Sequence, residues 1–267
     1  MRVAALYDIH GNLPALEAVL RELDAAMPDR IVIGGDIVPG PMPREVLARL
    51  QQLHVPADFI RGNCELAVLD EAAGKPAAVP ESARPPLQWT ARELSPDERE
   101  LLARWPKTLS LEIAGLRNVL FCHATPRDEN EIFTRLTPEE LLAPVFAAAN
   151  APLVVCGHTH MQFDRTIGKT RVVNAGSVGM PFGKPGADWL FLSDDAGVEL
   201  RHTDYDLNAA AARVRASNYI HAEEFAAKYV LNPPSEEQML ELFTSDSLAN
   251  ARWPTGTPHE KILHQNS

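Results

Sequence analysis

The first third of the chain repeats one pattern, in which a short apolar run ends in polar residues and a helix follows. Three such runs occupy residues 2–7, 30–33 and 57–60 and end in Asp8-Ile9-His10, Gly34-Gly35-Asp36 and Arg61-Gly62-Asn63. Apolar residues at three- and four-residue spacing predict helices over about 13–23 and 44–53. Strands that alternate with helices favour parallel pairing through right-handed crossovers. The polar residues are therefore expected at the carboxyl edge of one sheet, where α/β proteins bind ligands.

A second polar motif, Gly157-His158-Thr159-His160, follows the apolar run 153–156. In an extended backbone, residues two apart point to the same face, so both imidazoles are predicted to meet one small object. Neutral imidazole is a ligand that transition metals prefer. Two histidines near a strand end also have an ordinary explanation as surface or hydrogen-bonded residues. The pair alone leaves both explanations open.

The middle of the chain predicts a helical insertion followed by hairpins. Residues 73–107 are rich in proline and carry two predicted helices, and they form either a lid over the site or plain packing. Alternating runs predict hairpins over 109–122, 163–174 and 189–202, so the second half is expected to be antiparallel in character. The glycine-rich segment 174–179 either lines the site or forms a structural turn.

The chain is expected to divide into a main domain, residues 1–205, and a helical C-terminal extension with a tail, residues 206–267. A capping box starts a helix after Ser235, and a polar tail is predicted after Thr244. No chemistry is predicted in the extension.

Composition excludes several classes of function. The formal net charge of -11 argues against general nucleic-acid binding and against binding to anionic membranes. The N-terminal apolar run is too short for a signal peptide and no stretch is long enough for a membrane span, so a cytoplasmic protein is expected. Cys64, Cys122 and Cys156 are widely spaced and odd in number, which disfavours disulfides, and the last two are predicted to be small buried hydrophobes.

The residues at the strand ends form an ordered set: Asp8, His10, Asp36, Asn63, His123, His158 and His160. In its order and immediate neighbours this set resembles the motifs of the calcineurin-like metallophosphoesterases, and the resemblance runs from Asp8 to about Gly179. It implies a mixed α/β fold of four layers, in which two mixed sheets form a sandwich flanked by helices.

The resemblance also implies a role for each of these residues. The first metal ion is held by Asp8, His10 and His160, the second by Asn63, His123 and His158, and Asp36 bridges them. Such donors suit Mn²⁺, which is expected first, as well as Fe or Zn²⁺. Two such ions lower the pKa of a shared water and clamp phosphoryl oxygens, so that a bridging hydroxide attacks in line. The expected catalytic residues are Asp36, Asn63, His123 and Cys64.

Cys64 occupies a position at which the chain departs from many relatives. Family members with strong phosphomonoesterase activity carry a histidine after the motif asparagine, where it assists the leaving group. Losing a general acid typically costs about 10² to 10⁴-fold and affects alkyl monoesters most. The chain thus resembles the small bacterial phosphodiesterase branch, which predicts diester hydrolysis of a small phosphate ester or nucleotide-like substrate. Cys64 itself is a weak donor, a metal-adjacent thiol or an inert spacer.

Several other polar residues have two explanations. Arg61 either contacts a substrate phosphate or forms a structural ion pair, and Asn12 either turns into the site or caps its helix. Arg127 is a weaker candidate for the site. The remaining histidines match no motif position and are expected to face solvent or to pack: His54, His202, His221, His259 and His264.

The same residues also allow functions other than phosphodiester hydrolysis. Within catalysis these are a phosphomonoesterase, a protein phosphatase and a dinucleoside-polyphosphate hydrolase. A non-catalytic scaffold that binds protein partners is expected to have lost metal ligands, and here none is missing. The sequence leaves the oligomeric state open.

Overall fold

The computed structural model describes residues 1–195 and 197–249. Its first sheet has the strand order β10-β9-β1-β2-β3. Strands β1 (Val3–Leu6), β2 (Arg30–Ile33) and β3 (Ala57–Phe59) run parallel, as the alternation of strands and helices predicted. Strands β9 (Ala187–Ser193) and β10 (Gly197–Thr203) complete the sheet in antiparallel pairing. The carboxyl ends of β1, β2 and β3 therefore share one edge.

The second sheet has the order β4-β5-β6-β8-β7. The expected antiparallel character is wrong at its centre, where β5 (Arg117–Cys122), β6 (Leu153–Cys156) and β8 (Thr170–Asn174) are parallel. Helix α6 (Glu139–Ala147) connects β5 to β6, and such a crossover is what parallel neighbours require. Antiparallel partners lie only at the two edges, β4 (Thr108–Ile113) beside β5 and β7 (Phe163–Ile167) beside β8.

Three buried clusters stack the elements into four layers. Alternate residues of β1 face opposite ways, so that Ala4 and Leu6 join the cluster beneath the helices while Val3 and Ala5 face the second sheet. A third cluster joins the far face of the second sheet to α6 and contains Cys122 and Cys156, which are fully buried as predicted. The chain has the α/β/β/α sandwich that the family resemblance implied.

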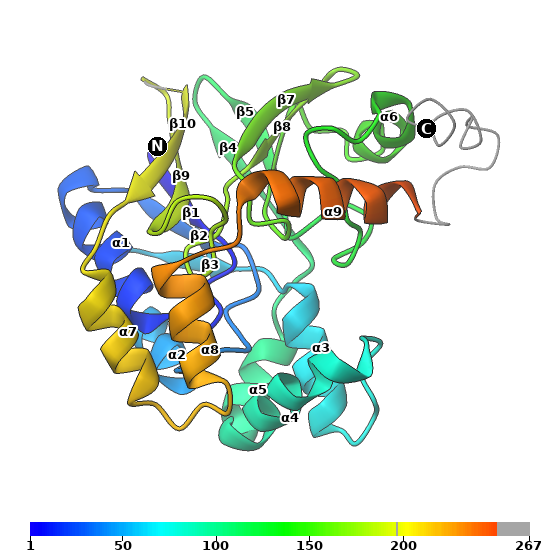
Figure 1. Ribbon diagram of the computed structural model, residues 1–267. Helices are drawn as coiled ribbons and strands as arrows, with labels where there is room; N and C mark the ends of the chain where they lie inside the picture. Colours follow the sequence, from blue (N-terminus) through cyan, green and yellow to red (C-terminus); the bar gives the residue numbers. More distant parts are fainter. Residues whose placement is uncertain (196, 250–267) are drawn as a thin grey trace.

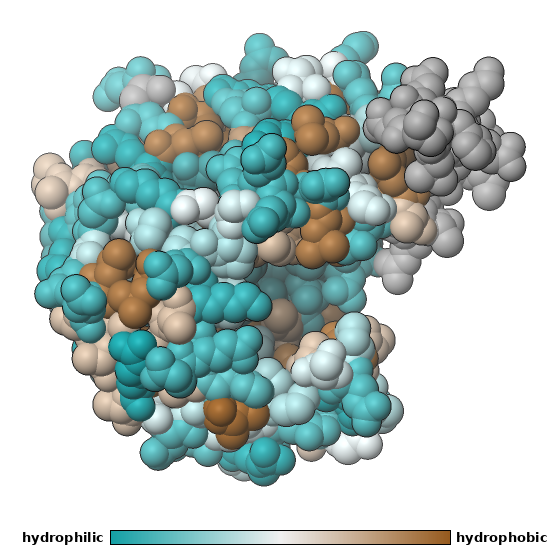
Figure 2. Space-filling view, viewed as in Figure 1, coloured by the Kyte–Doolittle hydropathy of each residue, from teal (hydrophilic) through white to brown (hydrophobic). Residues whose placement is uncertain are grey.

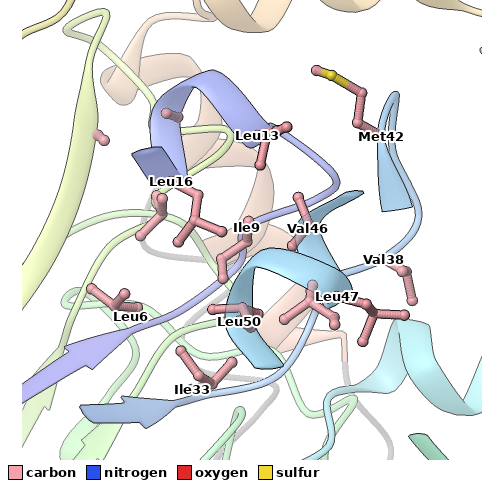
Figure 3. Close-up of a cluster of buried hydrophobic side chains, with 14 of the residues drawn as sticks. Leu6, Ile9, Leu13, Leu16, Ile33, Val38, Met42, Val46, Leu47 and Leu50 are labelled. Atoms are coloured by element: carbon pink, nitrogen blue, oxygen red, sulfur yellow. The ribbon is translucent and has the colours of Figure 1, made fainter. Parts of the chain in front are cut away.

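The helices of the first layer follow the apolar spacing seen in the sequence. Helices α1 (Leu13–Ala26) and α2 (Pro43–Gln51) place Leu16, Leu47 and Leu50 over Leu6 and Ile33 of the sheet (Figure 3). Burial of side chains like these contributes about 1.5–3 kcal/mol each. Ile9 and Ile37, in the loops that follow β1 and β2, are fully buried in the same cluster.

The predicted insertion folds as a group of helices after β3. Residues 73–107 comprise the 3₁₀ turn η1 (Glu81–Ala83), α4 (Arg84–Glu93) and α5 (Pro96–Ala103). Helix α3 (Asn63–Ala72) precedes them, and α3, α4 and α5 lie together in Figure 1. Leu87, Leu102 and Trp105 are buried in the same cluster as α1 and α2, so the insertion packs on the core. A lid motion stays a prediction.

The C-terminal extension is helical, with α7 (Leu207–Arg215), α8 (Ala222–Phe225), the π-helical turn η2 (Ala226–Leu231) and α9 (Glu236–Leu248). Helix α9 crosses in front of the second sheet in Figure 1. It continues past Thr244, after which a polar tail was predicted. Its last turn contacts the domain, because Ser247 hydrogen-bonds Thr137 at 3.0 Å and Leu248 packs near α6. The rest of the predicted tail, with His259 and His264, lies outside the described residues. Within residues 1–195 and 197–249, no helix is long and apolar enough to cross a membrane.

Candidate metal centre

The seven motif residues lie just beyond the strand ends and meet between the two sheets. Asp8 and His10 follow β1, Asp36 follows β2 and Asn63 opens α3, while His123 follows β5 and the two remaining histidines follow β6. Five of the seven have a left-handed backbone: Asp8, His10, Asp36, His158 and His160. Side chains other than glycine rarely adopt this conformation, and the surrounding packing must hold it.

The expected extended backbone at His158 and His160 is wrong, because their φ angles are 69° and 57°. The left-handed turns send the two rings to different partners. His158 lies against His123, with ring centroids 5.1 Å apart, and His160 lies against His10 at 5.0 Å. One short motif thus serves two groups of donor atoms.

The first group consists of Asp8, His10 and His160, whose ligand atoms all lie within 4.8 Å of one another. The Nε2 atoms of His10 and His160 are 3.2 Å apart, and Nε2 of His160 is 3.3 Å from Oδ1 of Asp8. Two imidazole nitrogens and a carboxylate oxygen here face one point.

The second group consists of Asp36, His123 and His158, again within 4.8 Å. Nε2 of His123 lies 3.4 Å from Oδ2 of Asp36 and 3.0 Å from Oδ1 of Asn63. Asp36 also reaches the first group, since its Oδ2 is 4.0 Å from Nε2 of His10. The carboxylate of Asp36 stands between the two groups.

Backbone carbonyls orient two of the rings. Nδ1 of His123 lies 2.9 Å from the carbonyl oxygen of Gly34, and Nδ1 of His160 lies 2.9 Å from that of Met180. A carbonyl only accepts, so each Nδ1 carries a proton and donates it. In the neutral ring this leaves the lone pair of Nε2 facing the group, which is the arrangement that histidine ligands of metals require.

Unsatisfied buried atoms test whether a cation fits. Among the described residues, Oδ1 of Asp8 and Nε2 of His158 are buried and make no hydrogen bond. Such atoms are costly to bury without a partner, and both belong to the candidate ligands. A bound cation would satisfy both, so the residues present fit a metal.

The pKa values of the histidines in the donor groups also agree with a bound cation. Burial lowers the pKa values of His10 and His158 to about 4, which keeps both rings neutral. Burial also opposes charge on His123, but the carboxylates of Asp36 and Asp8 prevail and raise its pKa to about 10. The two carboxylates therefore hold a proton on His123 where a metal cation would supply the positive charge.

Glu65 supports the centre from behind and has no motif position. It is fully buried, and its carboxylate accepts hydrogen bonds from the backbone N–H groups of Asp36 at 2.8 Å, Ile37 at 2.8 Å and Gly62 at 2.7 Å. Burial and the charge of Asp36 raise its pKa to about 7. A glutamate three residues after Gly62, where α3 begins, is the capping pattern in the sequence that could have drawn attention to it.

Cys64 lies beside Asp36 and contributes through its backbone, whose N–H donates to Oδ1 of Asp36 at 2.8 Å. Its Sγ also lies within the same 4.8 Å limit of donor atoms from His10 and Asp36. Burial and the charge of Asp36 raise the pKa of the Cys64 thiol well above its usual value. The side chain is therefore a neutral thiol next to the donor atoms.

The proposed substrate-binding residues have protein partners. Nε of Arg61 forms an ion pair with Glu129 at 3.0 Å. Asn12 is fully buried, caps α1 by accepting from Ala15 and donates to the carbonyl of Gly179 at 2.8 Å. Arg127 pairs with Glu131. These are the structural alternatives of the sequence analysis, and contact with a substrate stays a prediction.

The segment 174–179 lies beneath the donor atoms and holds their backbone. Asn174 donates to the carbonyl of Gly157 at 2.6 Å, and the Ser177 hydroxyl donates to the carbonyl of Asp8 at 2.8 Å. The segment joins the loop after β1 to the loop after β6. Its role is that of a structural turn.

A cavity of about 490 Å³ opens from the donor groups. Figure 2 shows the surface hollowed between α9 and the helices α3 and α4. The C-terminal extension, for which no chemistry was predicted, supplies part of its wall, including Tyr219, His221 and Phe243. No motif marks these residues, because their place at the site follows from the folding of the extension onto the domain.

Comparison with known proteins supports the family resemblance. The chain is 27% identical to the uncharacterized protein MJ0912 of Methanocaldococcus jannaschii over 234 residues, 79% of this chain and 91% of that protein. It resembles the solved structure of hypothetical protein PH1004 from Pyrococcus horikoshii OT3, with TM-score 0.74, 20% identity and coverage of 88% of this chain and 99% of that one. For a metallophosphoesterase from Sphaerobacter thermophilus the TM-score is 0.65 and the identity 27%, covering 86% and 99%.

The family itself follows from a match over most of the chain. The calcineurin-like phosphoesterase superfamily domain matches residues 1–194, which include every motif residue from Asp8 to His160. The chain belongs to the calcineurin-like phosphoesterase superfamily.

Proposed function

We propose that this protein is a phosphodiesterase that uses two divalent cations, with Mn²⁺ the first choice and Fe or Zn²⁺ the alternatives. The observation that carries the proposal is the convergence of two buried donor groups on Asp36, with Oδ1 of Asp8 and Nε2 of His158 left without hydrogen bonds among the described residues. Carboxylate, imidazole and amide donors without a thiolate are typical of sites for these metals.

One cation would be held by Asp8, His10 and His160 and the other by Asn63, His123 and His158, with Asp36 shared. Such a pair of cations supplies Lewis acidity toward phosphoryl oxygens and lowers the pKa of water. The chain contributes orientation: Gly34 and Met180 fix the rings of His123 and His160, and Glu65 fixes the backbone of Asp36. Fixed donors of this kind need no rearrangement during the reaction.

Cys64 supports the choice of diesters. A thiol with a raised pKa is a poor proton donor, so an alkoxide leaving group gains little assistance from it. Alkyl monoesters depend most on such assistance. We therefore expect diesters with good leaving groups to be hydrolysed faster than alkyl monoesters.

The test compares bis(p-nitrophenyl) phosphate with p-nitrophenyl phosphate. Metal-stripped protein receives Mn²⁺, Fe²⁺, Zn²⁺ or Mg²⁺ in turn, and Asp36→Ala is measured beside Asp70→Ala, an exposed aspartate on α3. The expected result is metal-dependent turnover that favours the diester. It should fall by about 10³-fold or more in Asp36→Ala, as loss of a group that stabilises the transition state does, and stay unchanged in Asp70→Ala.

Two outcomes contradict the proposal in different ways. A preference for p-nitrophenyl phosphate would make the protein a phosphomonoesterase, and faster cleavage of diadenosine tetraphosphate would make it a dinucleoside-polyphosphate hydrolase. Equal residual activity in Asp36→Ala and Asp70→Ala, with or without metal, would favour a non-catalytic scaffold.

A further inference from the structure

The cavity beside the donor groups has two unlike sides. One side carries the candidate ligands, and the other is built by the insertion and the C-terminal extension. The second side is mostly apolar and aromatic: Val79, Leu87, Tyr219, Phe225, Tyr229 and Phe243. With about 490 Å³, the cavity has room for an organic group of the size of an aromatic ring or larger beside a phosphate.

Charged groups are also distributed unevenly between the two sides of the cavity. None of the described residues that line it is lysine or arginine, and Glu224 adds a carboxylate to the side away from the donor groups. Cations at the donor groups would balance one phosphate. Glu224 is 59% exposed and pairs with Lys228 at 3.9 Å. A second phosphate or a carboxylate on this side would meet the carboxylate of Glu224 and no lysine or arginine of the lining, and like charges close together repel.

Arginines of the surrounding elements already have anionic partners. Arg61 pairs with Glu129 at 3.0 Å, and Arg84, at the start of α4, pairs with Glu71 at 2.8 Å. Recruiting either one for a second anion on the substrate would break an existing ion pair. The cavity therefore selects against substrates with several anionic groups.

We propose that the substrate joins a single phosphate to an uncharged, largely apolar group that lies between α4, α8 and α9. This inference rests on the proposed function, because it assumes that the phosphate binds at the donor groups. It excludes nucleoside polyphosphates and phosphorylated acidic peptides as good substrates. The ring of Phe243, packed near Phe182 at 6.1 Å between centroids, is a specificity-determining contact.

The test measures binding of phosphonates, which cannot be hydrolysed, to the metal-loaded full-length protein by calorimetry. The probes are methylphosphonate, phenylphosphonate and 4-carboxyphenylphosphonate, at a pH where all are fully ionised. We expect phenylphosphonate to bind about 10-fold or more tightly than methylphosphonate, since a ring buries several carbons in an apolar pocket. The added carboxylate should cancel this gain.

Two variants and a control locate the effect. Phe243→Ala should weaken phenylphosphonate about 5-fold or more and leave methylphosphonate unchanged. Leu242→Ala, the exposed neighbour on α9, should change neither probe. Ser82→Arg places a cation on the wall at an exposed position of η1 and should improve binding of the carboxylated probe alone.

The outcomes separate the two proposals. If methylphosphonate binds and phenylphosphonate binds no better, the apolar-group inference is wrong while the phosphoesterase proposal stands. If the carboxylated probe binds best in the unmodified protein, the exclusion of a second anion is wrong. If metal is bound and no phosphonate binds, the donor groups do not take a phosphate and both proposals fail.

Discussion

His158 shows at the scale of one residue how the donor groups depend on backbone strain. Its φ of 69° lies in the left-handed region, as do those of four other candidate ligands. That conformation costs an L-residue roughly 1–2 kcal/mol relative to right-handed backbone, and glycine escapes the cost. The chain therefore places imidazole and carboxylate groups where glycine would be the more stable residue.

Replacing His158 by glycine or by alanine isolates this strain, because both changes remove the imidazole. We expect His158→Gly to be more stable than His158→Ala by about 1 kcal/mol in urea unfolding without metal. The control is Arg92, an exposed residue of α4. There we expect Arg92→Gly to be less stable than Arg92→Ala by a similar amount, because glycine weakens helices. A more stable His158→Ala would show that the left-handed backbone is not strained.

The candidate ligands could be found from sequence because each carries a distinctive side chain in a fixed order. The capping pattern accounts for only one of the hydrogen bonds of Glu65, and its full role was not predicted because it depends on the backbone N–H groups of two separate loops. Tyr219 and His221 were missed for a related reason. Their place at the cavity follows from tertiary packing, which no local pattern in the chain records.

At the scale of elements, Glu71 joins α3 to α4. Its carboxylate accepts from Nε of Arg84 at 2.8 Å, from the N–H of Ala77 at 2.9 Å and from Gln88 at 3.0 Å. These partners, Arg84 foremost, hold the pKa of Glu71 at about 2, below its ordinary value of 4.5. The resulting stabilisation is present above pH 4.5 and is lost as the pH falls toward about 2.

Glu71→Gln should therefore loosen the insertion without loosening the sheets. We expect hydrogen-exchange protection to fall by about 10-fold in α4 and α5 at neutral pH and to stay unchanged in β1 and β2. The difference between variant and unmodified protein should shrink as Glu71 becomes protonated in acid.

Glu100→Gln is the matched control, since the exposed pair of Glu100 and Arg104 lies at the end of α5 and joins no second element. Equal loss of protection in β1 and α4 would mean that the insertion does not open separately.

The order of elements was largely predictable, and the pairing of the second sheet was not. Apolar runs, the alternation of apolar and polar residues, and turn residues located the strands of both sheets and the hairpin of β7 with β8. Whether β5, β6 and β8 lie parallel depends on which strands become neighbours after α6 crosses over. That choice is made by packing of the whole sheet, and local sequence does not encode it.

At the scale of the whole molecule, the C-terminal extension shares the core of the main domain. Val214, Phe225 and Val230 are buried in the same cluster as Leu6 and Ile33. Truncating a buried phenylalanine typically costs about 3–5 kcal/mol. We expect Phe225→Ala to lower the free energy of unfolding by this amount in one transition, followed by both fluorescence and circular dichroism.

Ile220→Ala is the control, because Ile220 is 47% exposed and should change the free energy by less than about 0.5 kcal/mol. An early separate transition of the extension in Phe225→Ala would show instead that it is an independent unit.

The family match ends at residue 194, whereas one wall of the cavity comes from residues 219–243. The donor groups thus lie within residues 1–194, whereas part of the wall that would border the rest of the substrate lies beyond them. Mutation or exchange of the terminal stretch can alter which ester is accepted while every donor atom stays in place. Related hydrolases can therefore come to differ in substrate through changes in the C-terminal segment, while the chemistry of the donor groups stays the same.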